Sequence, residues 1–284
     1  MWKYGWVLLV AVAGSGCVHR FECTVHGGRV VRQVETEHFV VTSDLDEDVL
    51  VKQASELEQL WQAWVVFFGH QPATSARLSV VLSSGGATAE FIEGAAGFVH
   101  YGAVPVMMSD VSGYDTPTGV KYYSANAHEM AHFVSHFWLR RQPRWFAEGL
   151  ANYLDDANFI RDGVVRMGRW QWNGGAVDTL ETMWAWDQMR ESGANEGQRY
   201  SSAWAWFHFF SNKEEGRLNR WLTALRTARS PTESFEEIFP KTEWAALHKR
   251  LEAYLNEGKY RGWETRGLEA GEMWKPRELA PWEV

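Results

Sequence analysis

The sequence predicts an α+β fold in which an N-terminal mixed β-sheet with a packed helix precedes a mostly helical lobe. Strand-like segments rich in Val occur before about residue 120, whereas apolar residues at helical spacing dominate after it. The 284 residues are 45% hydrophobic, which is sufficient for one sizeable buried core. We therefore expect a single domain over residues 27–258, with a sheet subdomain at about 27–120 and a helical subdomain at about 121–258. The tail at 259–284 has scattered Gly, Pro and charged residues and is predicted to be irregular.

The expected sheet begins with two strands within residues 27–44, where Val is frequent and apolar and polar residues alternate. A helix is expected next, over residues 46–68, because its apolar residues recur at helical spacing. Gly69 follows immediately and is typical of a helix end. This helix is expected to pack one face on the sheet.

Two further strands are expected after this helix. The segment ARLSVVL, residues 76–82, is apolar and β-branched, and GAVPVMMSD, residues 102–110, has the pattern of a short strand. The second segment carries Pro105, which cannot donate a hydrogen bond to a neighbouring strand. We therefore predict that this strand lies at an edge of the sheet or ends in a bulge. An edge strand can also accept an extended peptide.

Helices are expected to make up most of the chain after residue 121. Apolar periodicity and stop signals place them at 122–140, 143–155, 200–212, 215–228 and 242–257. The sequence also allows a hairpin at 160–170. The seventeen tryptophans are spread along the chain, and we expect most of them to fill the core or line a groove.

The N-terminus carries an ordered set of export features. Lys3 precedes an apolar run at residues 6–13, and small residues then lead to Cys17. This order is typical of an export signal, and the run is too short for a permanent membrane-spanning helix. The dipeptide Ser-Gly directly before Cys17 resembles the bacterial lipoprotein signal, whereas Gly14 stands where an aliphatic residue is usual.

We therefore predict a signal peptide over residues 1–16 and a lipid anchor on Cys17, which would hold the exported protein to a membrane of the bacterial cell envelope. The outer membrane or a periplasm-facing position is expected. The alternative is an ordinary signal peptide that contains a cysteine. In that case, Cys17 and Cys23 could bridge a short loop in an oxidising compartment, whereas acylation of Cys17 leaves no internal disulfide.

The net charge of the chain limits the kinds of partner that it can bind. The formal net charge is -8, from 36 acidic and 28 basic residues. Such a chain has no positive field that could neutralise the phosphates of a nucleic acid, so nucleic acid is not an expected partner. The chain also has only two cysteines, which excludes a cysteine metal site.

Three residues of the helix expected at 122–140 spell the motif HExxH: His128, Glu129 and His132. Residues four apart lie one turn above each other on one helix face. The two imidazoles can therefore bind one tetrahedral zinc ion, with the glutamate beside the open position. The helix is apolar on nearly every side, so we expect it to be buried. Burial of these polar groups costs free energy unless hydrogen bonds or a metal ion compensate for it. The alternative is a core helix whose histidines hydrogen-bond to the backbone while Glu129 meets an arginine.

The third zinc ligand has two candidates. Glu148 lies inside the next predicted helix, sixteen residues after His132, and a short turn between the helices can bring it opposite the histidine pair. His136 lies on the same helix face as the two histidines of the motif. Three residues spaced by four along one straight helix cannot converge on one ion, because the outer two are roughly 11–12 Å apart. We therefore predict Glu148 as the ligand and His136 as a residue at the rim of the site or behind a ligand.

HExxH followed by a helix with Glu-Gly-Leu-Ala resembles the gluzincin zinc peptidases, the thermolysin-like superfamily. The segment PRWFAEGLANYL is especially similar to bacterial peptidase-MA-like proteins, and the resemblance covers about residues 35–255, most strongly 126–154. It implies a zincin-type catalytic domain in which the three predicted ligands hold Zn²⁺. The implied reaction is hydrolysis of a peptide bond in a peptide or protein substrate, with Glu129 as the general base.

The resemblance also implies roles for residues outside the motif. Asn152 occupies the position at which the family places a carboxylate that orients the first histidine, and an amide polarises a histidine less. Tyr200, in RYSSAWAWFHFF, matches the family's Tyr-x-x-x-Trp-x-x-x-x-Phe helix and would stabilise the oxyanion; the alternative is a tyrosine packed in the core. Tyr153 and His208 are weaker candidates. The strand at 104–108 would hold the extended substrate.

Two other functions are compatible with the sequence. A non-catalytic zinc-binding envelope lipoprotein would act in binding or assembly, but a purely structural site has no need of a general base. A lipoprotein that binds the cell wall through its tryptophans would lack any motif for that role. A metzincin is excluded, because Ser135 and Trp138 stand where that class requires a glycine and a histidine.

Overall fold

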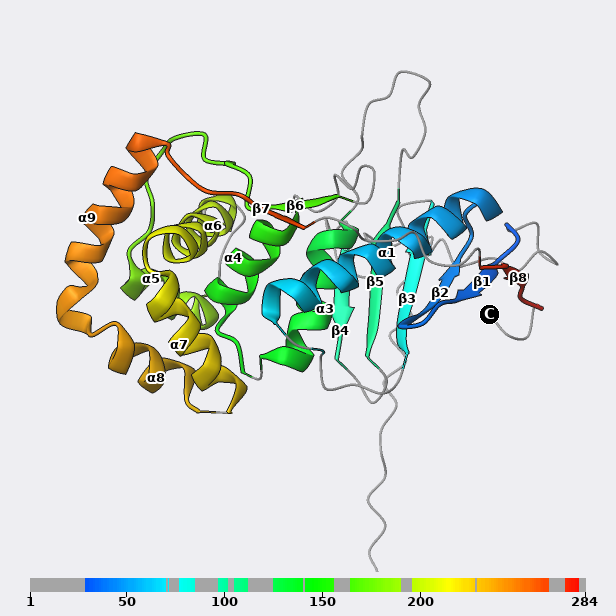
Figure 1. The fold of residues 1–284 in the computed structure, drawn as a ribbon, viewed down its shortest axis with the longest axis horizontal. Helices are drawn as coiled ribbons and strands as arrows, with labels where there is room; N and C mark the ends of the chain where they lie inside the picture. The colour runs from blue at the N-terminus through cyan, green and yellow to red at the C-terminus, as the bar shows by residue number, and fades with distance from the viewer. Residues whose placement is uncertain are drawn as a thin grey trace, which may run out of the picture.

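The computed structural model describes residues 29–69, 71, 77–84, 97–101, 105–111, 125–139, 141–155, 164–189, 196–227, 229–265 and 274–280. Cys17, Cys23 and the signal peptide predicted at 1–16 lie outside these residues. Within them, a six-stranded mixed sheet with a packed helix is followed by a mostly helical region (Figure 1). This arrangement confirms the predicted α+β class.

The main sheet has the strand order β4-β5-β3-β2-β1-β8. The pairs β2–β3 and β3–β5 are parallel, and the pairs β1–β2, β1–β8 and β4–β5 are antiparallel. The strands are β1 (Arg32–Glu35), β2 (Phe39–Ser43), β3 (Leu78–Ser83), β4 (Gly97–His100), β5 (Val106–Asp110) and β8 (Arg277–Glu278). The first three strands form where the sequence predicts them.

Helix α1 (Glu47–Phe68) ends at Gly69, as predicted, and crosses in front of the sheet in Figure 1. Alternate residues of the central strands are fully buried, among them Val41, Val80 and Met107. Because alternate residues of a strand point to the same face, these residues give the sheet one continuous apolar face for the core.

The strand predicted at 102–110 is not an edge strand, so this prediction is wrong. β5 begins at Val106 and pairs with β3 on one side and with β4 on the other. Pro105 directly precedes β5, so its missing N–H removes no hydrogen bond from either ladder. β4 forms this edge of the described sheet instead. It was not predicted, because its four residues are too few to show an alternation.

The helical region begins with α3 (Asn126–Trp138) and α4 (Arg144–Asp155), each inside a predicted helix. The elements that follow are α5 (Leu180–Ala185), the 3-10 helix η3 (Trp186–Gln188), α6 (Glu196–Lys213), α7 (Glu215–Arg226), α8 (Pro231–Ile238) and α9 (Lys241–Glu257). α5 and α8 were not predicted, although Thr179 and Ser230 cap them by accepting backbone N–H groups. None of the helices in the described part of the chain has the length and apolar character that crossing a membrane requires.

Two short strands connect the helical region to the C-terminal tail. β6 (Val165–Met167) pairs antiparallel with β7 (Trp263–Thr265). Residues 160–163 of the hairpin that the sequence allows at 160–170 lie outside the described residues. The tail also supplies β8, which pairs with β1 at the far edge of the main sheet (Figure 1). The prediction of an irregular tail is therefore wrong for β7 and β8. The partners of these two strands lie more than 90 residues away in the sequence.

Helices α4 and α6 approach each other closely. A Cβ atom at Gly149 would collide with the backbone carbonyl oxygen of Ala203, so only glycine fits at this crossing. Aromatic rings fill the core beside it: Trp145 stacks on Trp221 with centroids 5.9 Å apart, and Phe235 packs against Trp221 at 4.9 Å. The close approach at Gly149 fixes α4 against α6, and the stacked rings fix α4 against α7 and α8. The buried rings also confirm that tryptophans fill much of the core.

Candidate metal centre

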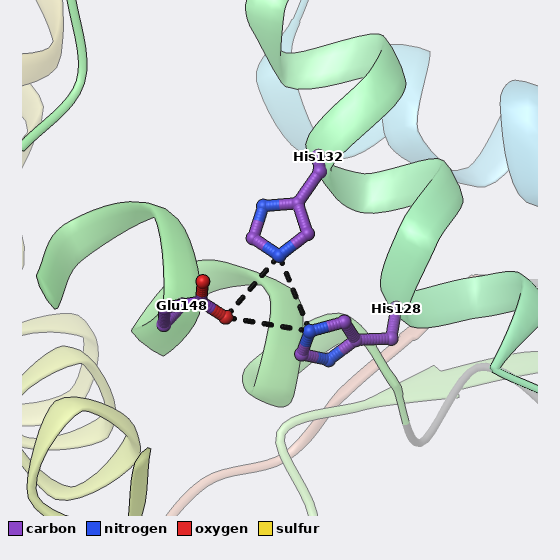
Figure 2. Close-up of side chains that lie close together, drawn as sticks. All are labelled: His128, His132 and Glu148. Carbon is purple, nitrogen blue, oxygen red and sulfur yellow. Dashed lines mark hydrogen bonds and ion pairs between the residues drawn. The ribbon is translucent and has the colours of Figure 1, made fainter. Parts of the chain in front are cut away.

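Three side chains from α3 and α4 converge on one point (Figure 2). The Nε2 atoms of His128 and His132, one turn apart on α3, lie 3.2 Å from each other. Oε2 of Glu148, on α4, lies 3.4 Å from Nε2 of His128 and 3.2 Å from Nε2 of His132. His128, His132 and Glu148 therefore form a group that could hold a metal ion.

These separations match those of a tetrahedral zinc site. Zinc bonds to nitrogen and oxygen are about 2.0–2.2 Å long, so ligand atoms at tetrahedral angles lie roughly 3.3–3.6 Å apart. Oε2 of Glu148 is buried and accepts no hydrogen bond from the described residues, although two imidazole nitrogens lie beside it. A buried oxygen without a donor is costly, and a metal ion at the point of convergence would satisfy it. Two imidazoles and one carboxylate are also a donor set that catalytic zinc sites use.

The electrostatics of the group favour an ionised Glu148. Burial alone raises the pKa of this carboxyl group, but its contacts with His128 and His132 outweigh burial and lower the pKa to about 2. The three side chains are between 14% and 18% exposed, so water screens them only in part. Glu148 is therefore ionised, which is the state in which a carboxylate binds a metal ion.

Glu129 lies beside His128 on α3 and is only 9% exposed. Burial raises the pKa of Glu129 to about 7, while the charge of His128 lowers it and the charge of Glu148 raises it. A carboxylate whose pKa is near neutral is suited to accept a proton and to release it again. The structure thus places Glu129 within electrostatic reach of the convergent group.

The edge strand β4 packs directly against Glu129. A Cβ atom at Gly97 would collide with Cγ of Glu129 and would lie 3.2 Å from Cβ of Ala125. Only glycine therefore allows β4 and α3 to approach this closely. Gly97 was not identified from the sequence, because no sequence signal indicates that this strand and this helix meet.

Gly97→Ala should destabilise the metal-free protein by about 1–3 kcal/mol, because the added methyl group overpacks the contact with Glu129. Denaturant unfolding measures this loss. Gly197→Ala is the matched control: a Cβ atom there meets nothing within 4 Å, and Gly197 lies in a helix, so stability should not fall. Equal stability of Gly97→Ala and the wild type would show that β4 does not press on Glu129.

His136 is not part of the convergent group. Its ring stacks on Tyr101, with centroids 4.3 Å apart and planes at 28°. The hydroxyl group of Tyr101 donates a hydrogen bond to the backbone oxygen of His132 at 2.8 Å. Because Tyr101 directly follows β4, these contacts fasten the edge strand to the helix that carries the histidines. Tyr101 was not identified from the sequence, where a single tyrosine in a Gly-rich passage carries no pattern.

Tyr200 and Asn152 lie where α6 crosses α4. Burial raises the pKa of Tyr200, the charge of Glu148 raises it further, and Arg144 lowers it. Nδ2 of Asn152 donates to the backbone oxygen of Tyr200 at 3.4 Å. Among the described residues, no hydrogen bond links Asn152 to His128. The contact expected from the resemblance is thus not present, and Asn152 joins the two helices instead.

The weaker candidates Tyr153 and His208 lie in the core. Tyr153 is 4% exposed and packs against Phe207 with ring centroids 5.1 Å apart. His208 is fully buried, with its ring nitrogens 2.7 Å from the hydroxyl group of Tyr254 and 3.0 Å from the carbonyl oxygen of Gly168. Burial lowers the pKa of His208 to about 4, so its imidazole is neutral. These contacts explain the burial of Tyr153 and His208 without a role for either residue at the metal centre.

No known protein-family model matches this chain, and a search of the curated proteins finds no match. The structure establishes that His128, His132 and Glu148 can hold a metal ion. The identity of the ion, the role of Glu129 as a base and the role of Tyr200 at the oxyanion stay predictions.

Proposed function

We propose that this chain is a zinc-dependent peptidase. The observation that carries this proposal is the convergence of His128, His132 and Glu148, with a second acid, the nearly buried Glu129, beside them. A structural zinc site is closed by four ligands, whereas three protein ligands with an open fourth position are typical of catalytic sites. The resemblance of HExxH and the Glu-Gly-Leu-Ala helix to the gluzincin peptidases supports the same reaction.

The residues around the group have the chemistry that peptide hydrolysis needs. Zinc bound there would acidify a water molecule and polarise the scissile carbonyl group. Glu129 accepts the proton of the attacking water and passes it to the leaving amine. Tyr200 donates its hydroxyl hydrogen to the carbonyl oxygen as negative charge develops there.

The peptide or protein substrate is proposed to bind along β4. This strand pairs with β5 on one side, and on its other side the described sheet ends. An extended peptide can add to such an edge through backbone hydrogen bonds. Because β4 contacts Glu129 through Gly97, a peptide on this edge would pass the proposed base. β4 thus takes the role that the resemblance gave to the strand at 104–108.

The location of the enzyme is proposed from the sequence alone. The apolar run and the Ser-Gly-Cys sequence support removal of residues 1–16 and acylation of Cys17. The enzyme would then be exported and held to a membrane of the bacterial cell envelope. The intact mass of the membrane-extracted protein tests this, since an unmodified N-terminus at another residue would exclude the anchor.

A peptide-library digest tests the proposed activity. The zinc-loaded protein should cleave peptides in the library, lose this activity in a chelator and regain it when zinc is added back. Chelator that is saturated with zinc beforehand is the control, because it should not inhibit. A zinc-loaded protein that cleaves nothing in the library would contradict the peptidase and would favour the non-catalytic zinc-binding lipoprotein.

A further inference from the structure

Tyr101 is exposed to solvent although its side chain is held in place. It is 46% exposed and is one of four exposed large hydrophobic residues in the described part of the chain. Its ring stacks on His136, with centroids 4.3 Å apart, and its hydroxyl group donates a hydrogen bond to the backbone oxygen of His132 at 2.8 Å. The proposed reaction gives this ring no role.

A fixed and exposed aromatic ring is suited to bind another side chain. Exposed hydrophobic residues that occur singly are common and do not by themselves indicate a binding site. A side chain that rotates freely, however, loses that freedom when a ligand binds, and the loss weakens the affinity. The stack on His136 and the hydrogen bond to His132 already order Tyr101. A partner that packs on its exposed surface therefore binds without this cost.

β4 places the ring of Tyr101 in one row with the glycine that contacts the proposed base. Gly97 faces the first turn of α3, where a Cβ atom on it would collide with Glu129. Tyr101 contacts His136 in the last turn of the same helix. Because alternate residues of a strand share a face, Gly97, Val99 and Tyr101 form a row along α3. Val99, in the middle of the row, is half-buried and packs against the core.

An extended peptide on the edge of β4 would place side chains beside this row. Residues that pair across two strands lie on the same face, with Cβ atoms about 4.5–5.5 Å apart. The peptide residue opposite Gly97 would therefore lie near Glu129, and the residue opposite Tyr101 would lie next to the tyrosine ring. Both peptide residues belong to one short extended segment, so a single peptide reaches the proposed base and the ring together.

We infer that Tyr101 is a specificity-determining residue whose ring receives an aromatic side chain of the peptide bound along β4. This inference rests on the proposed function, because it requires a peptide on that edge. Val99 and the ring of His136 surround Tyr101 with apolar and aromatic surface, and aromatic pairs stabilise a contact beyond the area that they bury. The hydroxyl hydrogen of Tyr101 is bonded to the backbone oxygen of His132, so it is not available to a polar side chain.

Peptide binding without turnover tests this inference. The zinc-loaded Glu129→Gln protein is titrated, by nuclear magnetic resonance, with a capped nine-residue peptide of Thr and Gln that carries a central Phe, and with the same peptide carrying a central Ala. The Phe peptide should bind about tenfold more tightly. When Tyr101→Ala is added, the difference should fall below about twofold. Tyr101→Phe should keep the difference, because it keeps the ring.

The preference in cleavage is a second readout. In a peptide-library digest, the zinc-loaded wild type should select an aromatic residue at one fixed position relative to the cleaved bond. The ratio of kcat/KM for Phe over Ala at that position should be about tenfold in the wild type and below about twofold in Tyr101→Ala. A tyrosine that only fastened β4 to α3 would instead lower kcat/KM for both peptides alike and leave the ratio unchanged.

Tyr260→Ala is the matched control for both readouts. Tyr260 is also exposed, at 40%, and its ring also stacks on a second ring, that of Trp170, with centroids 5.4 Å apart and planes at 28°. It lies between α9 and β7 in the chain and contacts no part of β4 through this stack. Its loss should leave both Phe-to-Ala ratios unchanged.

The outcomes separate this inference from the proposed function. Equal or undetectable binding of the Phe and Ala peptides would overturn the inference, as would a preference that survives Tyr101→Ala or disappears in Tyr101→Phe. A central Arg that binds more tightly than Phe would overturn the aromatic class of the side chain. A protein that binds the Phe peptide with the expected dependence on Tyr101, but cleaves no peptide, would contradict the peptidase alone.

Discussion

Glu129→Gln should keep zinc and lose about 10²–10⁴-fold in kcat, because the amide has the shape of the carboxyl group but cannot accept the proton of a water molecule. Glu129 is the acid beside the three convergent side chains, and burial raises its pKa to about 7. Peptide turnover and zinc content are measured on the same sample. Glu252→Gln, at an exposed position of α9, is the control and should leave both unchanged.

The loss of activity in Glu129→Gln should not come from unfolding. Burial raises the folded-state pKa of Glu129 from 4.5 to about 7, so the ionised group is less favourable in the fold than in the unfolded chain. The contribution of this carboxyl group to stability is therefore present below about pH 4.5 and is lost as the pH rises through about 7. Glutamine buries no charge, so the metal-free variant should be at least as stable as the wild type at pH 8. Thermal unfolding checks this, and turnover at the wild-type rate would exclude Glu129 as the base.

The parts of the fold that could be predicted from the sequence are those whose pattern is long and local. α1 repeats its apolar spacing over 22 residues and ends at a glycine, so its position follows from the sequence. β4 has only four residues, and its place at the edge depends on pairing with β5 rather than on its own composition. Likewise, β6 pairs with β7, which lies in the C-terminal tail. The local sequence around β6 gives no signal that its partner comes from that tail.

The candidate site divides in the same way. His128 and His132 are one turn apart on one helix, so their convergence follows from helical geometry. Glu148 could be predicted because only a short turn separates its helix from theirs. Gly97 could not, because it reaches Glu129 only through the packing of β4 against α3, two elements that are distant in the sequence.

Glu148→Ala should lower the affinity for zinc by more than about 100-fold, whereas His136→Ala should change it less than about tenfold. Substitution of a group behind a zinc ligand typically costs 10–100-fold, so loss of one of three direct ligands should cost more. Oε2 of Glu148 lies 3.4 and 3.2 Å from the two histidine nitrogens, whereas the ring of His136 stacks on Tyr101. Competition with a chelator of known affinity measures the change, on wild-type protein that should hold about one zinc ion per chain.

Glu148→Gln separates the charge of this ligand from its shape. The amide oxygen can still reach the ion, but the site loses its negative charge, so the affinity should fall between those of the wild type and Glu148→Ala. His136→Ala should affect the attachment of β4 rather than zinc binding. Without the ring that stacks on Tyr101, β4 is less firmly attached to α3, so KM for a peptide should rise while zinc stays bound. A greater loss of zinc in His136→Ala than in Glu148→Ala would overturn the assignment of the third ligand, because Glu148 would then be an acid that merely lies near the histidines.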